Sequence, residues 1–160
     1  MNIREALTTD ISILASHHRR MFEEIWRSKG EALNPEIAIG VENAYSQKLE
    51  LELTAEICKA WVAEDERKIV SSGAITFISL VPNPSDLSPR VAYLHSLYTE
   101  KGYRNRKYSQ RIIQRVIAYC KSNGINRVQL NASAAGRPVY EKMGFKPAPD
   151  SMRLFLNGYP

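Results

Sequence analysis

The chain contains 160 residues, of which 44% are hydrophobic and 24% are charged. A chain of this size can bury one hydrophobic core but is short for two, so we expect a single domain over residues 1–160. The composition is that of a globular protein and excludes a disordered or fibrous chain. A formal net charge of +5 favours an anionic ligand or surface, although it does not identify which one.

The two cysteines, Cys58 and Cys120, lie in apolar stretches without a second cysteine or a histidine at metal-ligand spacing. We therefore expect neither a disulfide framework nor a metal site. No stretch approaches the roughly 18 apolar residues that span a bilayer. The sequence thus predicts no membrane segment and a cytoplasmic location.

The N-terminal part is predicted to be mainly helical. Residues 2–6 can form a short strand, and the Thr-Thr-Asp sequence at 8–10 supplies N-cap chemistry for a helix. Apolar residues then recur at helical spacing as far as about Lys29. A second helix is expected between Pro35 and Lys59.

From Lys59 onward, short apolar and β-branched runs predict strands. Residues 60–63 and 69–81 flank a charged turn and predict an antiparallel hairpin. The following loop, 82–89, contains three prolines, which are incompatible with a central strand. The next strand is expected over residues 90–98.

The C-terminal part alternates between helices and strands. A helix over residues 108–122 is indicated by apolar residues at helical spacing and by an Asn-Gly stop. After it, the patterns predict a strand over 127–132, a short helix over 135–143 and a last strand over 152–156. The expected order is β, α, α, three β, α, β, α, β.

The junction between the strand ending at Thr99 and the helix beginning at Tyr108 predicts an anion site. A helix N-terminus presents unpaired backbone N–H groups and the positive end of the helix dipole. Arg104, Arg106 and Lys107 lie in this junction and suit a diphosphate better than a single carboxylate. On these residues alone, a solvated basic turn is the alternative interpretation.

The same junction carries a family resemblance. Residues 97–109, LYTEKGYRNRKYS, resemble the acetyl-CoA signature of the GNAT superfamily of N-acetyltransferases. Residues 130–145, LNASAAGRPVYEKMGF, are similar to that superfamily's penultimate strand, final helix and closing Tyr-x-x-x-Gly-Phe motif. The resemblance extends over residues 2–156. It implies a mixed α/β (α+β) fold with a mostly antiparallel sheet of about six to seven strands, splayed between the fourth and fifth, and about four flanking helices.

The resemblance also implies acetyl-CoA as the acyl-donor cosubstrate, without a metal. Of the family's phosphate-loop pattern only Arg104 is retained, because Lys107 and Ser109 stand where glycines are usual. A lysine follows the same backbone path without strain if its φ is negative. The residues expected to hold the cofactor are Leu97, Tyr98, Thr99, Arg104, Asn105, Arg106, Lys107, Tyr108, Ser109, Asn131, Ser133 and Arg137.

Two residues are expected to move protons. Tyr140 occupies the position at which the family often has a tyrosine that protonates the departing CoA thiolate; without the family, a packing role is the alternative. His95, on the central strand, is the expected general base, and a structural histidine is its alternative. His18, Glu24 and Glu100 are further candidates for the base.

The resulting hypothesis is an N-acetyltransferase that moves an acetyl group from acetyl-CoA to a primary amine of a small molecule or peptide. The amine attacks directly in a ternary complex, since no nucleophile arrangement is evident. A catalytically weak or inactive GNAT-like module that binds acyl-CoA is the first alternative. Nucleic-acid binding through the basic segment is a second, but neither nucleic acid nor a membrane is the expected partner. The resemblance is compatible with a homodimer.

Overall fold

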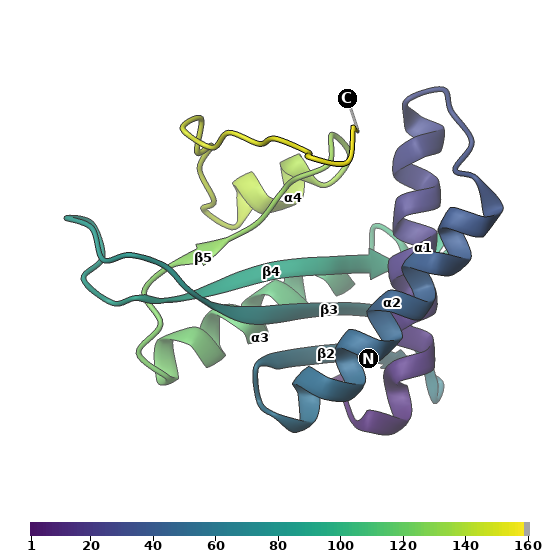
Figure 1. Ribbon diagram of the computed structural model, residues 1–160. Helices are drawn as coiled ribbons and strands as arrows, with labels where there is room; N and C mark the ends of the chain where they lie inside the picture. Colours follow the sequence, from purple (N-terminus) through teal and green to yellow (C-terminus); the bar gives the residue numbers. More distant parts are fainter. Residues whose placement is uncertain (159–160) are drawn as a thin grey trace.

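The computed structural model describes residues 1–158 and contains one mixed sheet with helices on both faces (Figure 1). The sheet has five strands in the order β1-β2-β3-β4-β5. The first four are antiparallel to their neighbours, and β5 is parallel to β4. The strands are β1 Asn2–Glu5, β2 Cys58–Asp65, β3 Lys68–Ser79, β4 Arg90–Thr99 and β5 Val128–Gln129. The helices are α1 Ile11–Ser28, α2 Pro35–Thr54, α3 Tyr108–Ser122 and α4 Arg137–Lys142.

The alternation of side chains along the strands divides the core into two layers. Because successive strand residues point to opposite faces, Val62 and Ala74 pack towards α1 and α2, whereas Trp61 and Ile75 pack towards α3. Burying these side chains at roughly 25 cal/mol per Å² is the main favourable contribution to folding. The sheet is thus covered on both sides, and the polar groups of β4 are held between two rigid layers.

A β-bulge interrupts β4 near its end. Ser72 pairs with Tyr98 and Ala74 pairs with His95, so Gly73 alone opposes both Ser96 and Leu97. One extra residue reverses the side-chain alternation of a strand. As a result, Leu97 packs in the α3 layer, whereas the ring of Tyr98 lies 5.0 Å from that of His17 on α1.

The predicted splay between the fourth and fifth strands is present in the structure. β4 and β5 are paired only at Ala92–Val128 and Tyr93–Gln129. Beyond these two pairs the chain after β5 turns away from β4, as Figure 1 shows. The edge of β4 after Tyr93 therefore lacks a strand partner within residues 1–158.

The prediction of six to seven strands is wrong, because the described residues form five. The expected strand at 152–156 is absent, and Met152, Leu154 and Leu156 are 96%, 81% and 92% exposed. The short neighbouring strand explains this outcome, because β5 offers a paired edge of only two residues.

Several predicted boundaries also move. The second helix ends at Thr54 and not near Lys59, because Glu56 has a φ of 55°, outside the helical region. The strand predicted at 127–132 contains only Val128–Gln129. No helix within residues 1–158 combines the length and the hydropathy needed to cross a bilayer.

Candidate functional site

The loop before α3 has the backbone shape of an anion site. Lys107 is the N-cap of α3 and has a φ of 64°, and Asn105 has a φ of 63°. The condition that Lys107 has a negative φ is therefore not met; the lysine adopts the left-handed conformation that glycine takes without a Cβ clash. No side chain within the described chain caps this helix, so the N–H groups of its first turn point outward without a capping acceptor.

Arg104 is held at the entrance of this loop by α1. Its Nε donates to the carbonyl of Thr99 at 3.0 Å, and its Nη2 donates to both carboxylate oxygens of Glu24 at 2.9 and 2.8 Å. The guanidinium also lies 5.6 Å from the centre of the Tyr98 ring. The phenol of Tyr98 donates to the same Glu24 carboxylate at 3.2 Å. An anion that binds Arg104 must therefore compete with Glu24.

A chain of hydroxyls fastens the start of α3 to the sheet. The Ser109 hydroxyl lies 2.9 Å from that of Thr99, which lies 2.8 Å from that of Ser71. Tyr108, predicted as a cofactor residue, is buried in the α3 core. Thr99, Tyr108 and Ser109, all expected cofactor residues, therefore hold the loop in place. The side chains of Asn105, Arg106 and Lys107 are exposed.

The other expected cofactor residues lie across the splay. Asn131 donates from Nδ2 to the Tyr93 hydroxyl at 3.0 Å. The Ser133 hydroxyl accepts the N–H of Gly136 at 3.1 Å, which orders the turn that leads into α4. Arg137 is exposed, and its Nη1 lies 3.8 Å from a Glu141 carboxylate oxygen.

Tyr140 is partly buried on α4 and packs on the α3 core. Its ring lies 5.8 Å from that of Phe145 in an edge-on arrangement. Burial, with a smaller effect of the neighbouring Tyr93, raises the pKa of Tyr140 to about 12. The phenol is therefore protonated at neutral pH, as a proton donor must be.

His95 is enclosed by hydroxyl groups. Its Nε2 lies 2.8 Å from the Thr76 hydroxyl, and its Nδ1 lies 2.9 Å from that of Ser96 and 3.3 Å from that of Tyr45. Burial, with smaller effects of Lys48 and His18, lowers the pKa of His95 to about 3. Both ring nitrogens are thus occupied, and the imidazole is neutral at pH 7.

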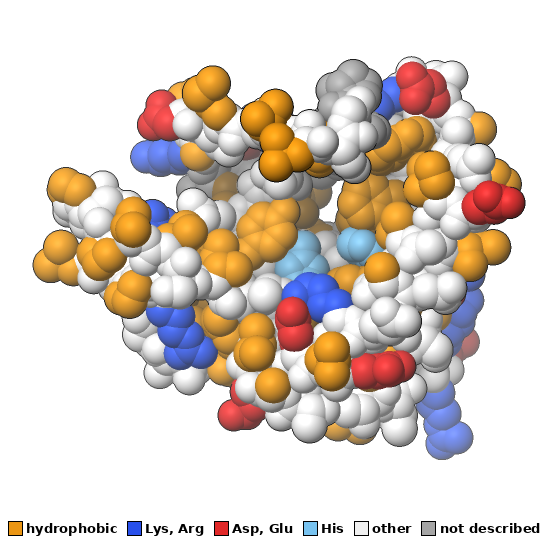
Figure 2. Space-filling model, viewed as in Figure 1, with side chains coloured by type: hydrophobic (Ala, Val, Ile, Leu, Met, Phe, Trp, Pro, Cys, Tyr) orange, Lys and Arg blue, Asp and Glu red, His pale blue; other side chains and the backbone are white. Residues whose placement is uncertain are grey.

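His18, a further candidate for the base, meets the same Ser96 from α1. Its Nδ1 lies 2.7 Å from the Ser96 hydroxyl, and its ring stacks on Tyr45 with the centroids 4.0 Å apart. Burial lowers the pKa of His18 to about 4. Figure 2 shows histidine surface on the floor of a hollow between the C-terminal segment and α1, with hydrophobic side chains around it.

His17, the neighbour of His18, has a different environment. It is 0% exposed, and its Nδ1 lies 2.8 Å from the Ser72 hydroxyl. Its Nε2 lies 3.5 Å from Glu100, another candidate base, whose carboxylate also pairs with Arg20 at 2.5 Å. Burial lowers the pKa of His17 to about 4. Glu100 is therefore paired with Arg20, while the nearby Nε2 of His17 makes no hydrogen bond within residues 1–158.

Tyr93 connects the two sides of the site. Its ring stacks on His95 with the centroids 5.8 Å apart, its hydroxyl accepts a hydrogen bond from Asn131, and it contributes to the raised pKa of Tyr140. Sequence reasoning missed Tyr93, Ser96, Tyr45 and Thr76. Nothing in the sequence marks them, because their proximity depends on the bulge in β4 and on the packing of α2 against the sheet.

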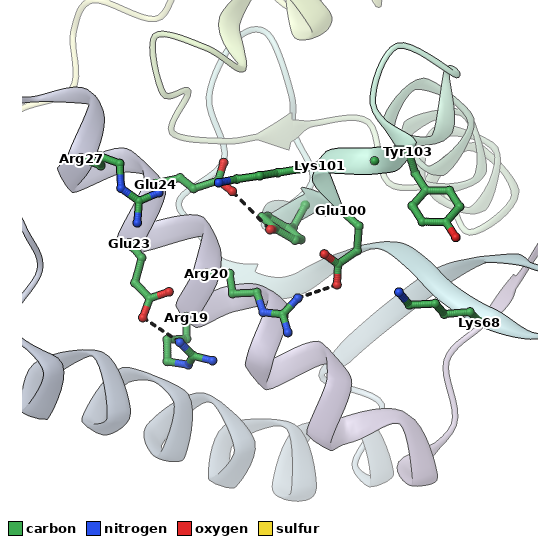
Figure 3. Close-up of a pocket in the computed structure, with 11 residues that line it drawn as sticks. Arg19, Arg20, Glu23, Glu24, Arg27, Lys68, Glu100, Lys101 and Tyr103 are labelled. Carbon is green, nitrogen blue, oxygen red and sulfur yellow. Dashed lines mark hydrogen bonds and ion pairs between the residues drawn. The ribbon is translucent and has the colours of Figure 1, made fainter.

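A second concavity of about 410 Å³ lies between α1 and the end of β4 (Figure 3). Its lining carries charges of both signs, and Arg19 and Arg20 are paired with Glu23 and Glu100. Tyr98 is the one expected cofactor residue among those that line it, and two further candidates for the base, Glu24 and Glu100, line it as well. No group of three potential metal ligands occurs within residues 1–158.

The uncapped N-terminus of α3 thus lies beside the unpaired edge of β4 in a splayed sheet. This arrangement is typical of a protein that binds a ligand with a phosphate group and an extended chain. Residues 15–145 match the sequence profile of the "Acetyltransferase (GNAT) family". The chain therefore belongs to the GNAT acetyltransferase family, as its α+β fold also indicates. No curated protein matches the chain.

Several solved structures share this fold. A predicted acetyltransferase from Clostridium acetobutylicum, crystallised with acetyl-CoA, is 28% identical with a TM-score of 0.86, covering 99% of this chain and 97% of that one. A GCN5-related N-acetyltransferase from Ralstonia eutropha JMP134 is 23% identical with a TM-score of 0.88, covering 98% and 99%. Glucosamine-6-phosphate N-acetyltransferase from Arabidopsis thaliana is 16% identical with a TM-score of 0.62, covering 97% of each chain.

Proposed function

We propose that this chain transfers an acetyl group from acetyl-CoA to a primary amine of a small molecule or peptide. The observation that carries the proposal is the continuity between the unpaired edge of β4 after Tyr93 and the uncapped N-terminus of α3. The first can pair with an extended amide-containing chain, and the second can accept a diphosphate. Acetyl-CoA contains both groups in one molecule.

The residues of the phosphate loop would hold the donor in two ways. The N–H groups at the start of α3 would bind the diphosphate oxygens, and the exposed cations Arg106 and Lys107 would add attraction. Leu97 to Thr99 would present backbone groups along the strand edge. Asn131, Ser133 and Arg137 would border the opposite side of the splay.

Transfer requires the amine to lose a proton and the thiolate to gain one. Tyr140, which is neutral at pH 7, would donate a proton to the sulfur. His95 would act on the amine side through the hydroxyls that surround it, because neither of its nitrogens is open to a substrate.

Direct attack by the amine is supported by the state of the two cysteines. Both are buried, and burial raises the pKa of Cys58 to about 11 and also raises that of Cys120. A thiol of this kind stays protonated at neutral pH and is a weak nucleophile. An acyl-cysteine intermediate therefore has no support from these two residues.

A screen of primary amines with acetyl-CoA, with release of the free thiol as the signal, tests the proposal. We expect turnover with at least one acceptor, together with acetyl-CoA binding in a calorimeter. Binding without turnover on any acceptor would favour a regulatory acyl-CoA-binding module. Absence of binding at millimolar acetyl-CoA would reject the proposed function.

A further inference from the structure

Ser96 has a strained backbone and a buried hydroxyl. Its φ is 56°, and the residue is 6% exposed at the bulge of β4. A left-handed conformation is costly for a residue with a Cβ, and such strain persists where the surrounding structure enforces it. The bulge places the Ser96 hydroxyl between two imidazoles, 2.7 Å from His18 and 2.9 Å from His95.

The hydrogen bonds form a continuous chain from His18 through Ser96 and His95 to Thr76. Each hydroxyl has one proton to donate, and each neutral imidazole has one N–H and one lone pair. The chain can therefore run in two directions. In one of them the Nδ1–H of His18 donates to Ser96, Ser96 donates to Nδ1 of His95, and the Nε2–H of His95 donates to Thr76.

The surroundings of Thr76, at one end of the hydrogen-bond chain, favour this direction of donation. When Thr76 accepts from His95, its own proton needs another acceptor, and the Cys58 thiol is available. Thr76 is the cross-strand partner of Cys58, so the side chains of the two residues are neighbours and the Thr76 hydroxyl can donate to the sulfur. Every proton in the chain then has an acceptor.

The His18 end of the hydrogen-bond chain is open to solvent. Nε2 of His18 makes no hydrogen bond within residues 1–158, and it is not among the fully buried polar atoms that lack a partner. This nitrogen of the partly buried His18 is therefore accessible to solvent. In the stated direction this nitrogen carries a lone pair and can accept a proton.

We propose that His18 is the catalytic base of this site, taking the ammonium proton at Nε2, and that Ser96 and His95 are positioning residues that fix its tautomer. The inference rests on the proposed acetyl transfer. An N–H bond of the ammonium breaks, its proton joins Nε2, and the nitrogen lone pair that remains forms the bond to the acetyl carbon as the carbonyl π electrons move to oxygen. When the carbonyl re-forms, the C–S bond breaks and the thiolate takes the Tyr140 proton. The second proton of the attacking nitrogen is then released and, through water, restores the Tyr140 phenol.

Titratable and charged groups from several elements surround His18 and His95 and influence their protonation. Around the two imidazoles lie Tyr45, Lys48 and Glu52 from α2, Cys58 from β2 and Tyr93 from β4. Lys48 is paired with Glu52, so its charge is partly compensated. Since His18 resists protonation to about pH 4, its basic form persists throughout the neutral range.

The test removes the Ser96 hydroxyl without adding strain. Ser96→Gly keeps the left-handed backbone accessible and deletes the link between the imidazoles. Ser72→Ala is the matched control, because Ser72 makes the equivalent 2.8 Å contact with Nδ1 of His17 on the adjacent strand. His18→Gln removes the proposed base itself, and calorimetry with acetyl-CoA monitors the integrity of each variant.

We expect Ser96→Gly to lower kcat/KM for the amine by about tenfold or more, and His18→Gln by 100-fold or more, with acetyl-CoA affinity within about twofold. Ser72→Ala should retain the wild-type rate and pH profile. The acid limb of kcat/KM should move to higher pH in Ser96→Gly, because water entering the site eases protonation of His18.

Nitrogen-15 NMR of the histidine rings provides a readout independent of turnover. In the wild-type chain without acetyl-CoA, we expect His18 in the Nδ1–H tautomer, and Ser96→Gly should reduce its population. An Nε2–H tautomer that Ser96→Gly does not change would overturn the proposal, as would wild-type turnover in both Ser96→Gly and His18→Gln. Failure of the wild-type chain to bind acetyl-CoA would instead reject the proposed function.

Discussion

Lys107 combines an exposed ammonium with a backbone conformation suited to glycine, and the two properties can be separated. Lys107→Gly should raise the free energy of unfolding by up to about 1 kcal/mol, because it relieves the left-handed strain. Acetyl-CoA affinity should be preserved or increased, since the backbone amides make the essential contacts in the proposed function. Thermal unfolding and calorimetry measure the two effects.

Lys107→Ala is the control for this prediction, because it removes the same charge and keeps a Cβ at a φ of 64°. It should not gain stability. A large loss of affinity in both variants would show that the ammonium is itself the phosphate contact.

Tyr140 is the residue for which chemistry and packing most need to be distinguished. Tyr140→Phe keeps the ring against Phe145 but removes the proton, so turnover should fall by about ten- to 100-fold with little change in melting temperature. Because burial places the pKa of Tyr140 at about 12, wild-type kcat should show no loss of this acid below about pH 10. Tyr119→Phe, on α3, is the control and should leave turnover unchanged.

The residues of the site differ in how far sequence could predict them. The position of Arg104 follows from a motif, but its ion pair with Glu24 joins two segments 80 residues apart. Ser96 carries no local signal at all, because its role depends on a bulge whose register is set by β3. His95 is predicted as the general base from its place on the central strand, but the hydroxyls that surround both of its nitrogens come from residues that sequence alone does not bring together.

At the scale of elements, the contact between α1 and the phosphate loop has a measurable consequence. Glu24→Gln removes the carboxylate that competes for Arg104, so acetyl-CoA affinity should increase by about two- to fivefold, the range of a partly exposed ion pair. Glu23→Gln is the control, since Glu23 pairs with Arg19 at 2.6 Å one helical position earlier. Calorimetry at two ionic strengths measures both. Weaker binding in Glu24→Gln would mean that Glu24 positions Arg104.

The β4 bulge requires a residue without a side chain on the opposite strand. A Cβ at Gly73 would lie 2.9 Å from Cδ1 of Leu97 and 3.0 Å from Cγ2 of Ile112. Gly73→Ala should therefore lower the free energy of unfolding by about 1–3 kcal/mol and Tm by several degrees. In Gly40→Ala, where no atom lies within 4 Å of the new methyl group, a helical alanine should be neutral or stabilising. Equal melting temperatures would disprove the packing argument.

The elements that sequence predicted well are those with strong local periodicity. The helix at α3 and the hairpin of β2 and β3 have apolar patterns that match their burial. The strand expected at 152–156 has a comparable pattern, but a strand exists only where a partner edge is present, and β5 is too short to provide one. Pattern alone cannot report the length of a neighbouring strand.

At the scale of the whole molecule, the three histidines couple folding to pH. Burial lowers the pKa of His17 and His18 to about 4 and that of His95 to about 3, whereas an unfolded histidine titrates near 6.5. Below pH 6.5 the unfolded chain therefore binds more protons than the folded one. The contribution of the three neutral histidines to the free energy of unfolding is fully present above pH 6.5 and is lost progressively as the pH falls towards 4.

Urea unfolding at pH 7 and pH 5 should show this dependence as a lower midpoint at pH 5, with a loss on the order of a few kcal/mol. His17→Gln should be less stable at pH 7, because it disturbs a side chain that is 0% exposed, but its stability should change less between the two pH values. The titrating group is identified by the change in stability between pH 7 and pH 5, and not by the stability at either pH. Equal pH dependence in the variant and the wild-type chain would show that His17 does not contribute to it.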